Sequence, residues 1–193
     1  MTLAAAYFTI EELRAEYPDL TNTTKYPNAK LEAARAFAEQ WFEAAAKVAY
    51  VPREVTETLT GNGNPVLFVS HYDRVRPPTV VKIDGVELTA GDLSALKSSS
   101  YGALLSTGKW PKDAAIEITY THGYDEPVEL ARQAVMMLAA EHAKPSTIPA
   151  RATSLSTDVG NYRISQADKT GQTGIPDVDA IIGLLGDDKP VTG

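Results

Sequence analysis

The stretch NAKLEAARAFAEQWFEAAAKVA, residues 28–49, decides the fold that we expect for this chain. Its apolar side chains recur every three or four residues, which places them in one stripe along a helix. Alanines in the stripe let another helix approach closely, and Pro52 ends the segment because proline breaks the helical hydrogen-bond ladder. Residues 28–49 therefore predict one half of a helical core, with a stripe formed by Leu31, Ala34, Ala38, Trp41, Phe42, Ala45, Val48 and Ala49.

A second amphipathic segment, residues 125–145, predicts the other half of this core. Pro127 is tolerated in its first turn, and Pro145 closes it. A shorter helix precedes both, because Thr9 and Glu12 form a capping-box signal. We expect the two long helices to pack stripe against stripe. The second stripe contains Val128, Ala131, Val135, Leu138 and Ala139, and the expected core-packing residues are Trp41, Phe42, Val135 and Leu138.

Between these helices the period of the apolar residues changes to two, which is typical of β-strands. Asp84-Gly85 separates two strand-like runs and predicts a two-residue hairpin, because both turn positions need a positive φ. Residues 90–108 read as irregular, with one short strand inside them. The section 55–122 thus predicts a small antiparallel barrel or sandwich, with strands at 55–59, 66–69, 79–83, 103–105 and 115–121.

The chain after residue 145 reads as an extended arm. Residues 146–174 are rich in serine, threonine and glycine and contain one strand-like piece, residues 162–164. The arm leads to a short helix, residues 176–185, which is too apolar to stay exposed. We expect this segment to leave the core and dock on another chain, such as a neighbouring subunit, and the alternative is that the helix folds back onto its own subunit. The expected partner-binding residues are Tyr162, Ile164, Ile175, Ile181, Ile182, Leu184 and Leu185.

These segments predict an α+β fold: a helical core of two long amphipathic helices with an inserted small antiparallel β unit and an extended C-terminal arm. The sequence shows no internal repeat. The expected organisation is N-terminal helices of the core at 1–54, the β unit at 55–122, the second long helix at 123–145, and the arm with its short apolar helix and flexible tail at 146–193.

The composition of the chain excludes several classes of function. With 18 basic and 25 acidic residues, the net charge of −7 argues against a nucleic-acid groove and against binding to an anionic membrane. The chain has no cysteine, so disulfides, thiolate metal sites and cysteine nucleophiles are excluded. No apolar run is long enough to span a membrane, and the first residues lack the positive charge of a signal peptide. We expect a soluble protein that is made and kept inside a cell.

No residue pattern supports catalysis, a cofactor or a metal. The histidines, His71, His122 and His142, are scattered, and no two have the spacing of metal ligands. Ser70, His122 and Asp125 can be combined into a triad, but no serine lies in the nucleophile elbow of a hydrolase. We therefore predict a protein that is not an enzyme and needs no cofactor or metal.

Two consecutive pieces of sequence, ITYTHGYDEP at 118–127 and LARQAVMMLAAE at 130–141, resemble part of a known family. They are similar to the strand-to-helix passage of head-to-tail adaptor (head-tail connector) proteins of long-tailed bacteriophages, particularly those infecting actinobacteria. The strand and turn at 55–63, the hairpin at 81–86 and the strand at 160–164 occur in the order that such adaptors show. The resemblance covers residues 28–185.

This resemblance implies a structural protein of the virion neck, located at the capsid–tail junction and assembled in the host cytoplasm. Such adaptors form a ring of twelve copies that joins the capsid portal protein to the next neck protein, a stopper or tail completion protein. Genomic DNA passes through the channel during ejection without sequence-specific binding, and an acidic channel repels its phosphates. No membrane is implied as a partner.

Two other functions are compatible with the residues. One is a stopper or tail-terminator type of neck protein, and the other is a non-viral binding module. The pair of alanine-rich helices favours the adaptor, because stoppers and terminators are mostly β.

Overall fold

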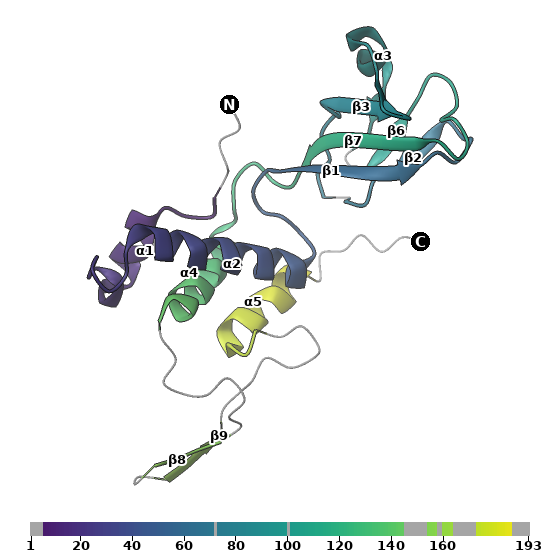
Figure 1. Cartoon of the computed structure of the whole chain (residues 1–193). Coiled ribbons are helices and arrows are strands. Elements are labelled where there is room, and N and C mark those ends of the chain that lie inside the picture. Colours follow the sequence, from purple (N-terminus) through teal and green to yellow (C-terminus); the bar gives the residue numbers. More distant parts are fainter. Residues whose placement is uncertain are drawn as a thin grey trace. The chain divides into compact units, whose positions relative to one another are not determined.

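The computed structural model describes residues 6–71, 73–99, 101–144, 154–157, 160–163 and 173–186 (Figure 1). Contacts within the chain separate it into two compact units. The β unit spans residues 49–126, and the helical unit contains residues 6–48 together with those from 127 onward. Helices and antiparallel sheets together confirm the expected α+β fold.

The helical unit contains α1 (Ile10–Glu16), η1 (Pro18–Leu20), α2 (Asn28–Ala46), α4 (Glu129–Ala143) and α5 (Pro176–Gly186). The capping box of α1 forms as predicted, because the Thr9 hydroxyl accepts from the backbone N–H of Glu12 and the Glu12 carboxylate accepts from that of Thr9. Helix α2 ends at Ala46 rather than at residue 49. Lys47 stops it by adopting a left-handed conformation with a φ of 56°.

Helices α2 and α4 pack against each other, as their matched stripes predict. Small side chains build much of this contact, so the two backbones can approach closely. Phe42 and Val135 are fully buried, and Leu138 is nearly so. The buried alanines are Ala34, Ala38 and Ala46 on α2 and Ala131, Ala134, Ala139, Ala140 and Ala143 on α4.

Four residues of the expected stripes are less buried than the rest: Trp41, Ala45, Val48 and Val128. Trp41 is only half-buried, because it lies at the edge of the buried stripe that passes through Ala38 and Phe42. Val128 is 43% exposed, because α4 begins one residue later and Val128 is its N-cap. An aromatic residue that precedes α1 is buried instead: Tyr7 meets the ring of Phe42 edge-on, with the centroids 5.9 Å apart.

The β unit is a sandwich of two antiparallel sheets. The larger sheet has the strand order β1 (Arg53–Thr60), β7 (Ala115–His122), β3 (Val80–Ile83) and β4 (Val86–Glu87). The smaller sheet has the order β2 (Val66–Phe68), β6 (Ala103–Leu105) and β5 (Lys97–Ser98). The turn between β3 and β4 has φ values of 49° at Asp84 and 82° at Gly85, which confirms the predicted two-residue hairpin.

One apolar core fills the space between the two sheets. The smaller sheet contributes Leu67 and Leu104, and the larger sheet contributes Ile116 and Ile118, all of them buried. Trp110 joins them from a loop and is 2% exposed. Its indole N–H donates to the Leu104 carbonyl at 3.4 Å, so the one polar atom of this bulky side chain has a partner.

The short helix α3 (Ala90–Ala95) occupies a stretch that we expected to be irregular. Thr89 caps it by accepting a hydrogen bond from the backbone N–H of Asp92 at 3.2 Å. Thr89 and Asp92 have the spacing of Thr9 and Glu12, so the same capping signal was present in the sequence.

In the arm, β8 (Ser154–Thr157) and β9 (Gly160–Arg163) pair as an antiparallel hairpin, where the sequence predicted a single strand. Helix α5, at the end of the arm, packs against α4 and α2 of its own unit (Figure 1). The expectation that this helix leaves the helical core is therefore wrong. Its apolar residues are covered in part by the nearest helices of the same chain.

Candidate interaction sites

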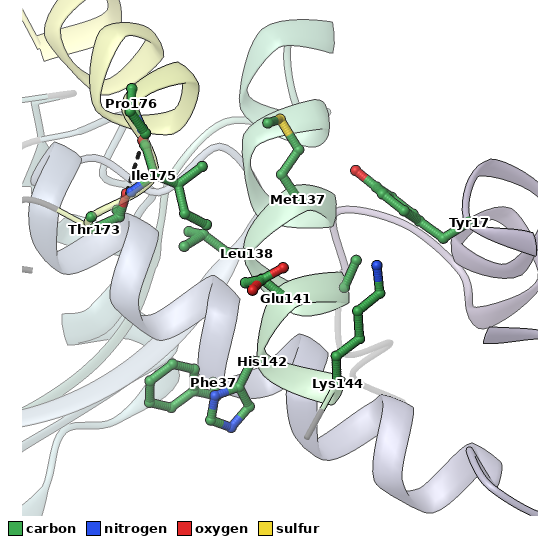
Figure 2. Close-up of a pocket in the computed structure, with 12 residues that line it drawn as sticks. Tyr17, Phe37, Met137, Leu138, Glu141, His142, Lys144, Thr173, Ile175 and Pro176 are labelled. Carbon is green, nitrogen blue, oxygen red and sulfur yellow. Dashed lines mark hydrogen bonds between the residues drawn. The ribbon is translucent and has the colours of Figure 1, made fainter. Parts of the chain in front are cut away.

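A groove of about 570 Å³ opens on the helical unit along α4 (Figure 2). Tyr17 lies on one side of α4, and the residues that lead into α5 lie on the other. The lining combines aromatic and aliphatic side chains with a few charged ones: Tyr17, Phe37, Met137, Leu138, Glu141, His142, Lys144, Thr173, Ile175 and Pro176. This mixture suits a protein segment that carries apolar side chains.

Ring contacts orient the side chains at one end of this groove. The imidazole of His142 stacks on Phe37, with the centroids 4.0 Å apart and the planes 12° apart, although Phe37 stays 44% exposed. The Lys144 ammonium lies 5.8 Å from the ring centroid of Tyr17 and 4.0 Å from the Asp19 carboxylate. Burial raises the pKa of Tyr17, with a smaller contribution from the negative charge of Glu16. The Tyr17 hydroxyl is therefore a neutral hydrogen-bonding group at neutral pH.

The residues of the arm and of α5 that we expected to bind a partner differ in how far they are buried. The Thr173 hydroxyl donates to Asp179 at 2.8 Å and its backbone N–H does so at 2.6 Å, which fixes the start of α5. Val178 is fully buried, whereas Leu184 is 70% exposed. Ile175, Ile181, Ile182 and Leu185 are half-buried. Tyr162 lies on β9, and Ile164 lies outside the described residues.

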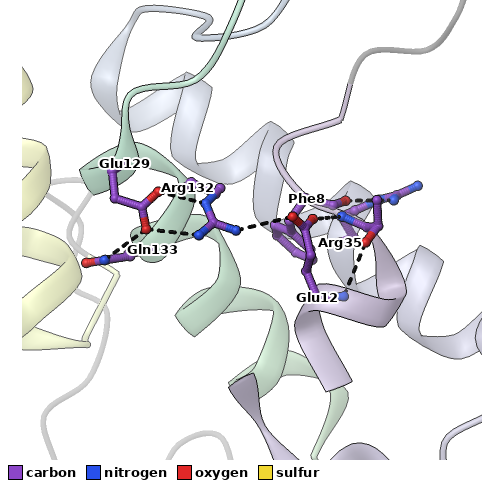
Figure 3. A network of polar contacts seen from close by, with 7 residues as sticks. Phe8, Glu12, Arg35, Glu129, Arg132 and Gln133 are labelled. Atoms are coloured by element: carbon purple, nitrogen blue, oxygen red, sulfur yellow. Dashed lines mark hydrogen bonds and ion pairs between the residues drawn. The ribbon is translucent and has the colours of Figure 1, made fainter. Parts of the chain in front are cut away.

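A network of charged side chains joins α1 to α4 (Figure 3). Arg132 donates to both carboxylate oxygens of Glu129 at 2.9 and 3.0 Å, and it lies 3.6 Å from the carboxylate of Glu12. Gln133 also donates to Glu129, at 3.0 Å. The hydrogen bonds from Arg132 and Gln133 lower the pKa of Glu129. Because the groups are largely exposed, we expect the network to orient α1 more than to stabilise it.

The β unit holds a cluster of polar side chains that come from distant parts of the sequence. Nδ1 of His122 lies 3.0 Å from Asp73, and the His122 ring stacks on His71 with the centroids 3.9 Å apart. Nδ1 of His71 is 2.8 Å from the Tyr120 hydroxyl. That hydroxyl donates to Glu57 at 2.9 Å. Sequence spacing gave no sign of this cluster, because its members meet only when His71 and Asp73 come to lie beside residues of β1 and β7.

Glu57 and Tyr120 form the first half of this cluster. Burial opposes the charge of Glu57, but hydrogen bonds from the hydroxyl and backbone N–H of Ser70 and from Tyr120 outweigh it and lower the pKa of Glu57. Burial, together with the hydrogen bond to Glu57, raises the pKa of Tyr120. The carboxylate therefore stays ionised and the phenol stays protonated at neutral pH.

Asp73 forms the second half and connects the cluster to both ends of the β unit. Its carboxylate accepts from the backbone N–H of Ala49 at 2.9 Å, and its carbonyl accepts from that of Gly123 at 2.7 Å. Burial opposes the charge of Asp73, but the hydrogen bonds with His122 and Ala49 outweigh it and lower the pKa of Asp73. Burial and the neighbouring His122 lower the pKa of His71. We conclude that the cluster holds Asp73 against the segment at Ala49, which precedes β1, and the segment at Gly123, which follows β7.

The side chains of the possible triad are engaged with different partners. Ser70 donates to Glu57, while Asp125 forms an ion pair with Arg76 at 2.6 Å. Within the described ranges, no group of three or more histidine, aspartate or glutamate side chains is arranged to hold a metal ion. A search of the described helices finds none that has the length and apolar character needed to cross a membrane.

No protein family and no curated protein matches the sequence. Solved structures match its fold over the full length. A chain from the neck of an empty gene transfer agent (GTA) particle, computed with C6 symmetry, gives a TM-score of 0.60 at 18% identity and covers 100% of this chain and 97% of that chain. A chain from the virion of the native GTA particle gives 0.61 at 18% identity with the same coverage. A chain from the neck of the native GTA particle, computed with C12 symmetry, gives 0.52 at 18% identity and covers 100% and 99%. These similarities show a shared fold.

Proposed function

We propose that this chain is a structural protein of a virion neck, a ring-forming adaptor that joins the capsid portal to the next neck or tail protein. The observation that supports this best is the shared fold with chains from GTA necks, which extends over the full chain and not over one motif. Those necks were computed with C6 and C12 symmetry, so repeated copies around an axis fit the proposal. The similarity does not point to an actinobacteriophage in particular, and that finer assignment stays a prediction.

The charge of the chain agrees with a role at a DNA channel. A net charge of −7 on each copy gives a ring an acidic character, which lets DNA pass without sticking to it. The proposal assigns no catalytic group, cofactor or metal to the chain. Its partners are other copies of itself, the portal, and the downstream stopper or tail completion protein.

Helix α5 is our candidate for one contact with the portal. Val178 holds the helix on its own unit, so the exposed side of α5 can bind a partner without detaching. Leu184, at 70% exposure, is the apolar side chain most available for such a contact. The half-buried Ile181, Ile182 and Leu185 lie beside it in sequence, and Ile175 lines the neighbouring groove. Tyr162 and Ile164 stay expected contacts of the arm.

The proposal is tested with the full-length protein, alone and mixed with the portal protein encoded in the same genome. Analytical ultracentrifugation and electron microscopy should show ring-shaped oligomers that bind the portal. A chain that stays monomeric at every concentration, with and without the portal, would contradict the proposed function.

The role of α5 is tested with Leu184→Ser, which removes an exposed apolar side chain and should weaken portal binding without unfolding the helix. The matched control is Ala180→Ser on the same helix, where an exposed residue changes little in size. Unchanged portal binding by Leu184→Ser would remove α5 from the contact, while ring formation would still support an adaptor.

A further inference from the structure

The smaller sheet of the β unit is apolar on both of its faces. Leu67 and Leu104 point into the sandwich core and are buried. Phe68 and Leu105, which alternate with them along the strands, are 67% and 39% exposed. A sheet with one face in water normally alternates apolar and polar side chains, so the outer face of this sheet is unusual.

The strand register places the outer side chains next to one another. Val66 pairs with Leu105 and Phe68 pairs with Ala103 between β2 and β6, and Lys97 of β5 pairs with Leu105. Directly opposite residues in antiparallel strands share a face and touch. The result is a contiguous outer patch, which we call the β2–β6 patch and define as Val66, Phe68, Lys97, Ala103 and Leu105.

The outer face of the larger sheet is built in the opposite way. The hydroxyls of Thr56 and Thr119 lie 2.8 Å apart, and Lys82 pairs with Glu117 at 2.5 Å. Glu87 shares this face because it pairs directly with Lys82. Apart from the half-buried Val80, which pairs with Thr119, the side chains of this face are polar.

We propose that the β2–β6 patch is a contact surface for a second copy of this chain in the ring. This inference rests on the proposed function, because it assigns one of the two surfaces by which neighbouring copies meet. A ring requires two different surfaces on each subunit that are complementary to each other. The patch supplies the apolar one, with Phe68 as its central aromatic side chain.

The distribution of charge indicates that a second copy of the chain covers the β2–β6 patch. In a chain with a net charge of −7, the three strands of the smaller sheet contain no acidic residue and one basic residue, Lys97. The outer face of the larger sheet carries the exposed Glu54 with Glu87 and Glu117, against the single Lys82. A basic apolar face and an acidic face on opposite sides of one sandwich are complementary between copies placed head to tail.

The test compares Phe68→Ser with Val86→Ser in the full-length chain. Both residues are exposed apolar side chains of the β unit, at 67% and 72%, but Val86 pairs with Ile83 and so lies on the face of β4 opposite Glu87, outside both proposed contact surfaces. We expect Phe68→Ser to need at least about tenfold higher protein concentration than the wild type for ring assembly. We expect Val86→Ser to assemble like the wild type. In a Trp41→Phe background, fluorescence of the buried Trp110 shows whether each variant keeps its folded β unit.

A second measurement covers the case in which Phe68→Ser loses its fold. The chain has no cysteine, so Phe68→Cys provides one attachment point for a benzophenone photo-cross-linker. We expect cross-links between two copies in assembled rings, at residues of the larger sheet.

Three outcomes would overturn the inference alone: assembly of folded Phe68→Ser at the wild-type concentration, cross-links confined to one chain, and cross-links to the portal only. Failure of the wild-type chain to form rings, with or without the portal, would overturn the proposed function and this inference with it.

Discussion

The two units of this protein differ in how many small side chains their cores contain. In the helical unit, α2 and α4 pack against each other and bury many alanines, such as Ala38 and Ala134, both fully buried. In the β unit, bulky side chains such as Trp110 and Tyr120 fill the space between two sheets. One core depends on how closely backbones approach, and the other depends on how much volume is filled. The same kind of substitution should therefore affect the two units differently.

Removing volume from the β unit should have the largest effect. Trp110→Ala leaves a cavity in a core where this side chain is 2% exposed, and it leaves the Leu104 carbonyl without the indole donor. We expect the free energy of unfolding to fall by about 3–5 kcal/mol. Urea unfolding followed by circular dichroism measures the change. Trp110→Phe keeps most of the volume and should lose less, and equal losses in the two variants would show that cavity size is not the cause.

Adding volume to the helical unit should have the next largest effect. Ala134 is fully buried on α4, so Ala134→Leu forces α2 and α4 apart or into strained rotamers. We expect a loss of about 1–3 kcal/mol in the free energy of unfolding. The control is Gln133→Leu, because Gln133 is the exposed neighbour on the same helix. If both variants unfold at the same urea concentration, the alanine contact is not tightly packed and the contrast between the units fails.

Acid should produce the smallest of the three effects, and it should act on the β unit. The pKa of His71 is lowered in the folded protein, so the unfolded chain takes up its proton first as the pH falls. Stability from His71 is complete above the ordinary histidine value of about 6.5 and declines as the pH falls below it. The lowered pKa values of Glu57 and Asp73 add a further loss of stability under stronger acid, as the pH falls through their folded values.

Trp110 can report this pH effect by itself in a Trp41→Phe background, because the chain has only two tryptophans. The urea midpoint of the Trp110 signal should decrease between pH 7.5 and 5.5. His71→Gln should make the urea midpoint less dependent on pH. His142→Gln, a change in the helical unit, should leave the pH dependence of the midpoint unchanged. A midpoint that stays constant over the same pH range would show that the histidine cluster does not couple protonation to folding.

Local signals in the sequence predicted much of the fold. The capping box at Thr9 and Glu12 and the hairpin at Asp84-Gly85 involve residues within one turn of each other, so their spacing determines their geometry. The apolar stripes of the two long helices could also be predicted from spacing, because their residues are three or four positions apart. Trp41 shows the limit of this reasoning, because a regular stripe says which side of a helix is apolar but not where the burial ends.

The polar cluster of the β unit could not be predicted from local sequence patterns. Asp73 and His122 are 49 residues apart, and only the pairing of strands and the folding of a loop bring them together. Helix α5 illustrates a related difficulty. Its composition predicted correctly that it is helical and needs a covering surface, but composition does not identify that surface, which proved to be α4 and α2 of the same chain.

The ends of the β unit lie side by side. The backbone N–H of Tyr124 donates to the carbonyl of Ala49 at 3.1 Å, and the rings of Tyr50 and Tyr124 stack with their centroids 5.3 Å apart. Gly123, with a φ of 92°, allows this closeness because a Cβ there would lie 2.4 Å from the carbonyl oxygen of Val51. Domains whose termini meet in this way tolerate insertion into other chains. The β unit can therefore be gained, lengthened or exchanged during evolution as one inserted piece, without a change in the two long helices that precede and follow it.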